Sequence, residues 1–468
     1  MSSPTRVEAP LLSDSWHNET ALISLVLAVF WLYLAADLAT LSMGLDGVIY
    51  ATIAKLGAAG EGSFWFPPYF DLDIEWFSDS PPLGVWLQSQ WFTLLGDSFW
   101  VEKTFCMLMA VVIAALMVTL CREIAPDRPA WWSLAIFFAM PVARHALKNN
   151  SLESMVTVAA LFAVWAAWHG RNKLWMNVLV AAGCLAGVLI KGPVGLFPLA
   201  APALFAWMID ASPRKAILVA AVSLGCLVAA MFAILSFDMA EASIGHYLKT
   251  QLLASLAGTR HIDHGRVYQL GQLLNNVAVA GIFICVAWLS SRKFHFSRTS
   301  WAFLGLGLAA SLPLLISPRQ YKHYLLPCLP FFAIWANIVV APYLARWSSK
   351  HIWAVTAFVL MFASGRTYWY FGATGKDADQ LSDVAAIAAA VASADVPVDY
   401  VEFCTARYPR RAYLARHHGL RTSSTPNEVT STTPPGYVVC ATNQPDEQLI
   451  RVLDLNDELA LWFRPGVK

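Results

Sequence analysis

The chain has 468 residues, of which 13% are charged and 57% are hydrophobic, and its mean hydropathy is +0.53. A soluble protein carries about 25% charged residues, so this composition excludes a string of soluble domains and requires lipid as part of the solvent. The formal net charge is +1, which leaves no basic field to hold nucleic acid. The composition therefore predicts an integral membrane protein.

Eleven apolar stretches have lengths close to the ~20 residues that cross a bilayer. We expect them at 20–43, 101–121, 129–143, 153–169, 174–190, 194–209, 216–236, 270–290, 300–316, 323–342 and 351–372. The first is too long and too poorly flanked for a cleaved signal peptide, so we expect it to remain as an anchor.

Basic residues in the short loops set the orientation of these spans. Alternate loops carry them, as Arg122 and Arg128, Arg171 and Lys173, Arg214 and Lys215, Arg292, Lys293 and Arg298, and Arg346 and Lys350. The positive-inside rule places these loops and the N-terminus in the cytoplasm. With eleven spans, the C-terminus then lies on the outer side of the membrane.

The loops on the outer side differ from the short basic ones. The first, at 44–100, is long, acidic and aromatic, and its part from Pro82 to Trp100 is expected to form a helix that lies in the membrane interface. A second outer loop at 237–269 is rich in charged residues and His. Long polar loops on one face of a membrane protein are typical places for its function.

The composition changes at about residue 376, which divides the chain into a membrane domain (1–375) and a small outer α/β domain (376–468). In the second we expect helices at 383–394 and 409–418, strands at 398–404, 437–441 and 459–463, and a loop at 422–435. Cys404 and Cys440 fall in two of these strands. Because the outer compartment is oxidising, we predict that they form a disulfide.

Charged side chains occur at the outer ends of the predicted spans. Asp46 follows the first span, Glu153 opens the fourth, Lys191 closes the fifth, and Arg319 and Lys322 precede the tenth. A charge near lipid costs about 2.5–3.5 kcal/mol unless it has a partner or a use. Carboxylates and cations on one face suit a reaction in which a carboxylate deprotonates an acceptor hydroxyl while the cations hold a phosphate leaving group.

Several short motifs follow one another along residues 20–345. They are Asp46 to Ala51, Phe77 to Leu87 with its Pro81-Pro82-Leu83 centre, Gly96 to Phe99, Lys191-Gly192-Pro193, and Tyr324 to Pro327. Their order resembles that of the ArnT-like and protein O-mannosyltransferase-like glycosyltransferases of the GT-C fold.

This resemblance implies an α-helical polytopic membrane protein that uses a polyprenyl-phosphate-linked sugar as donor. Asp46 matches the catalytic Asp of the family's first outer loop, and Glu153 falls where many relatives carry a second acidic residue. The substrate-binding residues would be Lys191, Arg319, Lys322, Tyr50, Arg266 and His264. Relatives of the aminoarabinose type carry charged or polar residues where this chain has Gly47-Val48-Ile49 and a Lys where it has Ser80, which leaves the sugar open.

Structural alternatives exist for the main candidates. Asp46 could cap a short helix over 48–55, and Glu153 could cap its own transmembrane helix. Lys191 could extend its amine to the membrane surface, as Lys residues at span ends commonly do. Arg319 and Lys322 could be interfacial anchors, but basic residues on the outer face run against the charge rule and favour a bound anion.

Two groups of residues could hold a metal. Asp71, Asp73, Glu75 and Asp79 resemble a divalent-cation cluster, and His261, Asp263 and His264 lie close together in the second outer loop. The spacing of the second group matches no standard site, and a solvated loop is the alternative for both. No metal site or cofactor is assigned, and a divalent cation is left open.

These features predict an inverting glycosyltransferase of a bacterial inner membrane, with its active site and C-terminus in the periplasm. Asp46 would be the general base, Glu153 would assist, and the cations would hold the leaving polyprenyl phosphate. The acceptor would be lipid A, lipopolysaccharide or another envelope glycolipid, with a protein hydroxyl as the alternative. A transporter or lipid flippase is the rival class, but it should carry charges near the middle of its spans, whereas here the charges other than Asp37 lie towards the span ends.

Overall fold

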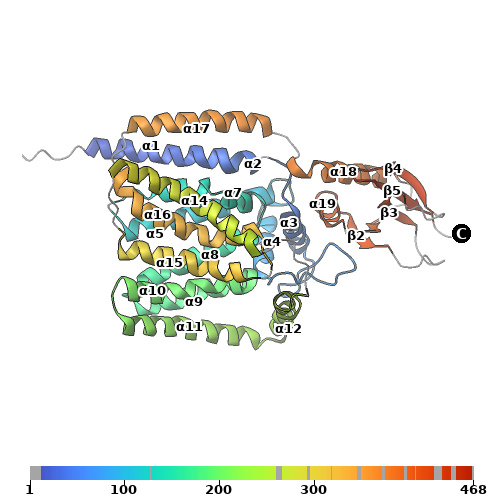
Figure 1. The fold of residues 1–468 in the computed structure, drawn as a ribbon. Coiled ribbons are helices and arrows are strands. Elements are labelled where there is room, and N and C mark those ends of the chain that lie inside the picture. Colours follow the sequence, from blue (N-terminus) through green and yellow to red (C-terminus); the bar gives the residue numbers. More distant parts are fainter. Residues whose placement is uncertain are drawn as a thin grey trace, which may run out of the picture.

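The structure is a computed structural model that describes residues 12–38, 40–126, 128–259, 266–291, 296–317, 319–344, 349–370, 375–394, 398–405, 407–425, 435–443 and 449–465. Its main part is a bundle of helices that run side by side (Figure 1). The bundle contains α1 (Leu12–Phe30), η1 (Trp31–Ala35), α2 (Ala36–Leu38), α5 (Val101–Ile124), α6 (Trp131–Ala139), α7 (Pro141–Lys148), α8 (Leu152–Gly170), η2 (Leu174–Met176), α9 (Asn177–Lys191), η3 (Gly192–Leu199), α10 (Ala200–Met208), α11 (Pro213–Leu235), α14 (Arg266–Ser291), α15 (Arg298–Ile316), η5 (Lys322–Cys328), α16 (Leu329–Leu344) and α17 (Ser349–Tyr370).

Each of the eleven predicted spans falls on helical elements of this bundle. Among the described residues, seven helices are long and apolar enough to cross a membrane by length and composition, and the run from Leu174 to Met208, counted as one of them, covers two predicted spans. Of the remaining spans, 20–43 and 129–143 combine shorter pieces, such as α6 with α7, and 351–372 falls on the single helix α17. The predicted polytopic helical architecture is confirmed.

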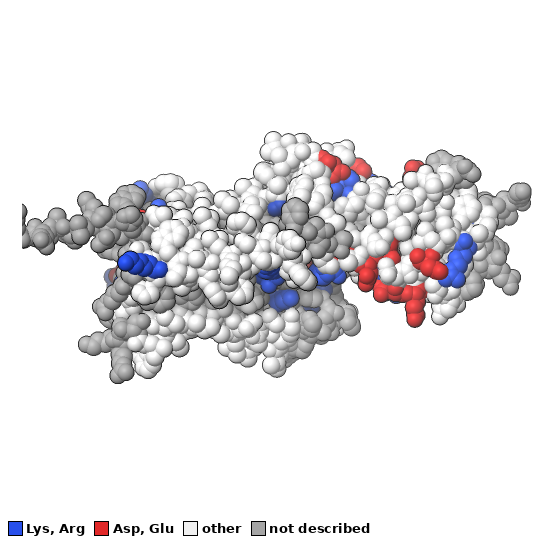
Figure 2. Space-filling model, turned by 90° about the horizontal axis from the view of Figure 1, so that it is seen from above, with Lys and Arg blue, Asp and Glu red and all other residues white. Residues whose placement is uncertain are grey.

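The two ends of the bundle have different surroundings. The predicted basic loops that the structure describes lie at one end, and shorter elements lie at the other, next to the C-terminal domain (Figure 1). These are α3 (Leu45–Ala58), α4 (Leu83–Leu95), α12 (Asp238–Tyr247), η4 (Leu248–Leu253), α13 (Ala254–Leu256) and η6 (Gly375–Asp377). In Figure 2, the Lys and Arg side chains visible on the bundle lie towards its two ends, and the surface between them is almost uncharged, as a lipid-facing surface requires. The predicted helix at 82–100 corresponds to α4.

The orientation in the membrane stays a prediction, and cysteine labelling tests it. Asn172 lies in a basic loop, and Ser382 lies on an exposed face of the C-terminal domain. In intact cells, Asn172→Cys should be protected from an impermeant thiol reagent, whereas Ser382→Cys should react above the level of the unsubstituted protein. Labelling of the first variant without the second would reverse the orientation.

The C-terminal domain packs two helices on a mixed sheet. Its described elements are α18 (Ala378–Ala392), β1 (Tyr400–Phe403), α19 (Tyr408–His418), β2 (Arg421–Ser424), β3 (Gly436–Ala441), β4 (Ile450–Asp454) and β5 (Leu459–Arg464). The strand order is β2-β1-β3-β5-β4, with β1 parallel to β2 and β3, and with β5 antiparallel to β3 and β4. The predicted loop at 422–435 is wrong at its start, because Thr422 to Ser424 belong to β2.

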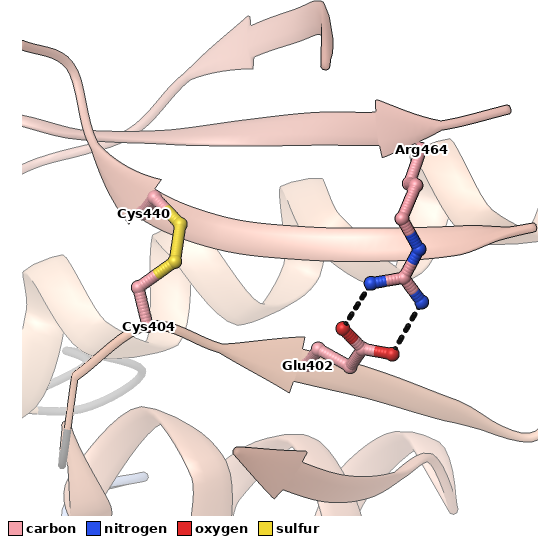
Figure 3. The surroundings of a disulfide bond; sticks show 4 residues. All are labelled: Glu402, Cys404, Cys440 and Arg464. Carbon is pink, nitrogen blue, oxygen red and sulfur yellow. Dashed lines mark hydrogen bonds and ion pairs between the residues drawn. A yellow bond between two sulfur atoms is a disulfide. The ribbon is translucent and has the colours of Figure 1, made fainter. Parts of the chain in front are cut away.

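The predicted disulfide is confirmed, because Cys404 and Cys440 are bonded (Figure 3). It joins the end of β1 to β3, whose Val439 carbonyl accepts a hydrogen bond from the Cys404 N–H at 3.0 Å. The Arg464 guanidinium on β5 reaches across β3 and donates two hydrogen bonds of 2.6 Å to the Glu402 carboxylate on β1, and both side chains are buried (Figure 3). The sheet is thus held by a covalent link and by a paired charge.

Helix α19 attaches this domain to the first outer loop. The Arg416 guanidinium, with a side chain only 2% exposed, donates to the Glu102 carboxylate at 2.7 Å and to Asp97 at 2.8 Å. The Lys55 amine contacts the other oxygen of Asp97 at 2.8 Å. Arg411, on the same helix, pairs with Asp71 at 2.7 Å. The C-terminal domain therefore docks on the loop and on the start of α5 through charge pairs, of which Arg416 with Glu102 and Arg411 with Asp71 are buried.

A second junction fixes the chain just before α3. The Asp377 carboxylate accepts hydrogen bonds from the Ser42 hydroxyl at 2.5 Å, the Tyr413 hydroxyl at 2.7 Å and the Gly44 N–H at 3.1 Å. Although burial acts to raise it, these hydrogen bonds hold the pKa of Asp377 below its usual range. Because Gly44 directly precedes α3, the junction determines where that helix begins.

Candidate functional site

A cavity of about 550 Å³ opens at the end of the bundle that faces the C-terminal domain. Its lining comes from α3, α7 to α9, η4, α14, η5 and the segments next to them. The lining residues that carry polar side chains are Asp46, Tyr50, Asp79, Ser80, His145, Asn149, Ser151, Glu153, Lys191, Gln251, Tyr268, Arg319, Tyr321, Lys322, His323, Tyr324 and Lys376. Elements from most of the chain length thus meet around one polar space.

Asp46 lies in the first turn of α3. The N-cap of this helix is Gly44, so the alternative in which Asp46 caps a helix over 48–55 is wrong. Its side chain is 54% exposed, and its Oδ2 lies 3.8 Å from Nε2 of His323. A Cβ on Gly47 would come within 2.1 Å of the Asn149 carbonyl oxygen, so the close approach of α3 to the end of α7 requires glycine there. The backbone contact places Asp46 at the cavity wall.

Glu153 is paired rather than free. Its carboxylate forms an ion pair with the Lys191 amine and accepts a 2.6 Å hydrogen bond from the Ser151 hydroxyl. Nε2 of His323 lies 3.6 Å from Oε1 of Glu153. The side chain of Glu153 is 1% exposed and that of Lys191 is 16% exposed. Ser151, not Glu153, is the N-cap of α8, but Glu153 lies in the first turn of that helix, where its charge is favourable at the positive N-terminal end.

Lys191 ends α9 at the cavity instead of extending to the membrane surface. Its amine lies 4.9 Å from the centroid of the Tyr324 ring, in addition to its pairing with Glu153. The next residue, Gly192, has a φ of 75°, and a Cβ there would lie 2.2 Å from the Tyr247 hydroxyl oxygen. This turn directs Lys191 inward, so the simple interfacial alternative does not describe it.

The segment before α16 supplies the other cations. Arg319 donates a 3.3 Å hydrogen bond to the Tyr321 hydroxyl, and its guanidinium carbon lies 5.4 Å from the centre of the Tyr321 ring. Lys322 begins η5 and also lines the cavity. His323 follows and lies between the carboxylates of Asp46 and Glu153. The segment therefore brings positive charge to the cavity and also links its two acidic residues.

Tyr50 lies one turn along α3 from Asp46 and is 8% exposed. Its ring meets that of Phe77 edge to face, with 6.0 Å between the ring centroids. Burial, and then the nearby charges of Asp46 and Glu153, raise the pKa of the Tyr50 hydroxyl well above its usual range. The hydroxyl therefore remains protonated and can act as a hydrogen-bond donor.

The structure brings together Asp46, Tyr50, Glu153, Lys191, Arg319 and Lys322, as the sequence predicts. The predicted residue His264 lies outside the described residues, and for Arg266 the structure describes the start of α14 but not the side chain. The sequence places His323 with Arg319 and Lys322 at the start of the tenth predicted span, but neither His323 nor Lys376 is among the predicted site residues. Because His323 directly follows Lys322, its position in the sequence could have indicated that it lies at the site. Nothing in the sequence connects Lys376 with Asp46.

The predicted acidic cluster does not gather as a metal site. Asp71 pairs with Arg411, Asp73 accepts a hydrogen bond from the Ser424 N–H, and Asp79 accepts one from Gln251. Within the part of the chain that the structure describes, no three His, Cys, Asp or Glu side chains gather as metal ligands would. His261 and Asp263 lie outside that part.

The fold and the motif order define the class: this is a membrane protein of the GT-C glycosyltransferase fold with a small C-terminal sheet domain. The structure is similar to the crystal structure of ArnT from Cupriavidus metallidurans bound to undecaprenyl phosphate. The similarity covers 98% of this chain and 100% of that chain, with a TM-score of 0.65 and 15% sequence identity. The Archaeoglobus fulgidus oligosaccharyltransferase AglB, in complex with an inhibitory peptide and a dolichol-phosphate, is similar over 92% of this chain and 70% of that chain, with a TM-score of 0.56 and 14% identity.

At the family level, residues 79–237 match the model described as dolichyl-phosphate-mannose-protein mannosyltransferase. This segment includes part of the first outer loop, Glu153 and Lys191. No curated protein matches the sequence significantly. The resemblance to ArnT-like and protein O-mannosyltransferase-like glycosyltransferases is confirmed.

Proposed function

We propose that this protein is an inverting glycosyltransferase that moves a sugar from a polyprenyl-phosphate donor to an acceptor hydroxyl in the cell envelope. The observation that carries the proposal is the exposed Asp46 carboxylate in the same cavity as Arg319 and Lys322. The undecaprenyl phosphate bound by ArnT and the dolichol-phosphate bound by AglB support a lipid phosphate as the leaving group. We place the site on the periplasmic face of a bacterial inner membrane.

In the proposed reaction, Asp46 takes the proton of the acceptor hydroxyl as its oxygen attacks the anomeric carbon of the sugar. The bond from this carbon to the phosphate oxygen breaks, and polyprenyl phosphate leaves with the electron pair. Arg319 and Lys322 stabilise the growing negative charge. Single displacement inverts the configuration at the anomeric carbon.

The role of Glu153 differs from that of Asp46. Because Glu153 is buried and paired with Lys191, it is poorly placed to accept the acceptor's proton. It instead holds Lys191 and His323 at the cavity, with His323 next to Asp46. We propose that Glu153 is a positioning residue and that Lys191 contacts the donor phosphate from this fixed place.

An arginine substitution tests the donor site. Arg319→Ala should raise the apparent donor constant by roughly tenfold or more, because a charged hydrogen bond to the bound donor contributes about 1.5–3 kcal/mol. It should also lower turnover, because the negative charge on the leaving phosphate grows in the transition state and the contact with Arg319 strengthens there. Arg298→Gln, at the opposite end of α15, is the matched control and should behave as the unsubstituted enzyme. A normal donor constant in Arg319→Ala would remove Arg319 from the donor site.

Two acceptors are compatible with this reaction. An envelope glycolipid such as lipid A is the first, and a protein hydroxyl is the alternative, favoured by the description of the matching family. Mass spectrometry of envelope lipids and glycoproteins from cells with and without the gene decides between them. A sugar lost from neither fraction would contradict the proposed function and favour a transporter.

A further inference from the structure

His323 is the side chain that connects the two acidic residues of the Asp46 cavity. It belongs to η5, whereas Asp46 lies in the first turn of α3 and Glu153 in the first turn of α8. Its Nε2 atom lies 3.8 Å from Oδ2 of Asp46 and 3.6 Å from Oε1 of Glu153. One ring nitrogen therefore faces carboxylate oxygens from two other helices, and the proposed reaction gives this ring no part.

Aromatic neighbours hold the imidazole of His323 in one orientation. The ring stacks on that of Tyr321, with 5.6 Å between the centroids and 18° between the planes, and it meets the ring of Tyr324 edge to face at 4.8 Å. The ring of His145, on α7, lies 6.5 Å away at 30° to it. Because these contacts restrict rotation of the ring, they fix the direction in which Nε2 faces the two carboxylates.

The surroundings of Nε2 determine which ring nitrogen carries hydrogen. A neutral imidazole has one nitrogen that donates a hydrogen bond and one that accepts. If Nε2 were the accepting nitrogen, its lone pair would face two negatively charged carboxylates, and that arrangement is repulsive. The pair of acidic neighbours therefore selects the tautomer with hydrogen on Nε2, which makes His323 a donor towards both carboxylates.

The two carboxylates differ in their need for this donor. Glu153 is paired with the Lys191 amine and accepts a hydrogen bond from the Ser151 hydroxyl. Asp46 is 54% exposed, and within the part of the chain that the structure describes only His323 brings a basic side chain within ion-pair distance of it. The contact of 3.8 Å is longer than a hydrogen bond, and catalytic hydrogen bonds of this kind shorten in the reacting complex.

We propose that His323 is a positioning residue, which orients Asp46 by donating a hydrogen bond from Nε2 to Oδ2 of Asp46. Oδ1 of Asp46 then remains available to take the proton of the acceptor hydroxyl. Glu153 lies on the other side of the same N–H group and is itself held by Lys191. A buried ion pair thus determines where the exposed base lies. This inference rests on the proposed function, in which Asp46 is the general base.

Two substitutions of His323 in the purified full-length enzyme test the proposal. His323→Phe keeps a flat ring next to Tyr321 and Tyr324 but has no donor. Its turnover should fall by about tenfold or more, while the apparent donor constant changes little. His323→Gln carries an amide N–H close to the position of Nε2 and should retain most of the turnover. A role in packing alone predicts the opposite order, because phenylalanine preserves the ring contacts better than glutamine does.

A double variant separates positioning from general damage. If His323 acts through Asp46, then His323→Phe should lower turnover little further once Asp46→Asn is present, so the two losses should not add. His417→Phe is the matched control, because His417 is also stacked on a tyrosine, Tyr413, at 5.6 Å, but lies on α19 away from the residues that line the cavity. This control should show the turnover and unfolding temperature of the unsubstituted enzyme.

Three results would overturn the positioning role. They are normal turnover in folded His323→Phe, a loss in His323→Gln as large as in His323→Phe, and losses that add fully in the double variant. If His323→Phe unfolds, His323→Asn replaces it, because its shorter side chain cannot bring an amide to the position of Nε2. Normal turnover in Asp46→Asn would contradict the proposed function and the positioning role with it. Normal turnover in His323→Phe beside an impaired Asp46→Asn enzyme would contradict the positioning role alone.

Discussion

Asp46→Asn is expected to retain the fold and donor binding while turnover falls by about 10²–10⁴-fold, the usual contribution of a positioned general base. The amide has nearly the same shape as the carboxylate but cannot take the acceptor's proton. The side chain is 54% exposed, so the substitution leaves no buried charge unpaired. The measurement is the rate of sugar transfer by the purified enzyme at a saturating donor concentration.

The apparent donor constant separates this variant from those at the phosphate site. In Asp46→Asn it should change little, whereas in Arg319→Ala it should rise. Glu153→Gln provides a contrast, because it removes a partner of Lys191 and should lower both donor affinity and stability. Near-normal turnover of a folded Asp46→Asn enzyme would remove the centre of the proposed mechanism.

Arg416→Met should destabilise the attachment of the C-terminal domain by about 3–5 kcal/mol, the typical cost of removing one partner from a buried ion pair. The side chains of Arg416 and Glu102 are 2% and 0% exposed, so the substitution leaves the Glu102 carboxylate buried without its cation. Methionine preserves much of the volume next to Phe92, whose ring centre lies 4.9 Å from the Arg416 guanidinium carbon. The effect should therefore come from charge rather than from packing.

The measurement is thermal unfolding in detergent, together with limited proteolysis at the junction of the two domains. Arg451→Met is the matched control, because Arg451 pairs with Asp454 on an exposed strand, with side chains 49% and 68% exposed. An exposed pair contributes at most about 1 kcal/mol. Equal unfolding temperatures for the two variants would show that the buried charges at the junction contribute little.

The sequence predicts the membrane part of the fold well, because a span is a local property of about 20 consecutive residues. It predicts the inner strands of the outer domain for a similar reason, since buried segments such as β3 are rich in apolar residues. The edge strands β2 and β4 escape prediction. Residues 421–424 read Arg-Thr-Ser-Ser, and most of β4 is exposed, so neither has an apolar pattern to mark it.

The residues of the candidate site also fall into those that the sequence indicates and those that it does not. The sequence indicates four site residues because each lies next to a predicted span, where a charged side chain is costly unless it has a partner or a function. They are Asp46, Glu153, Lys191 and Arg319. The pairing of Glu153 with Lys191 joins two helices, and nothing in either segment indicates it. Lys376 is harder still, because it reaches the cavity only through the junction of Asp377 with Ser42 and Gly44, more than 330 positions away along the chain.

The pairing of Asp37 with Arg366 has a consequence for biosynthesis. These residues are 329 positions apart, and at ~5–20 residues per second a ribosome needs roughly 15 to 65 s to make the chain between them. During this interval the first span already carries its carboxylate while α17 does not yet exist. In this interval Arg144 and Lys148 can pair with Asp37, and the end of the bundle that faces the C-terminal domain can close only after translation has passed α17.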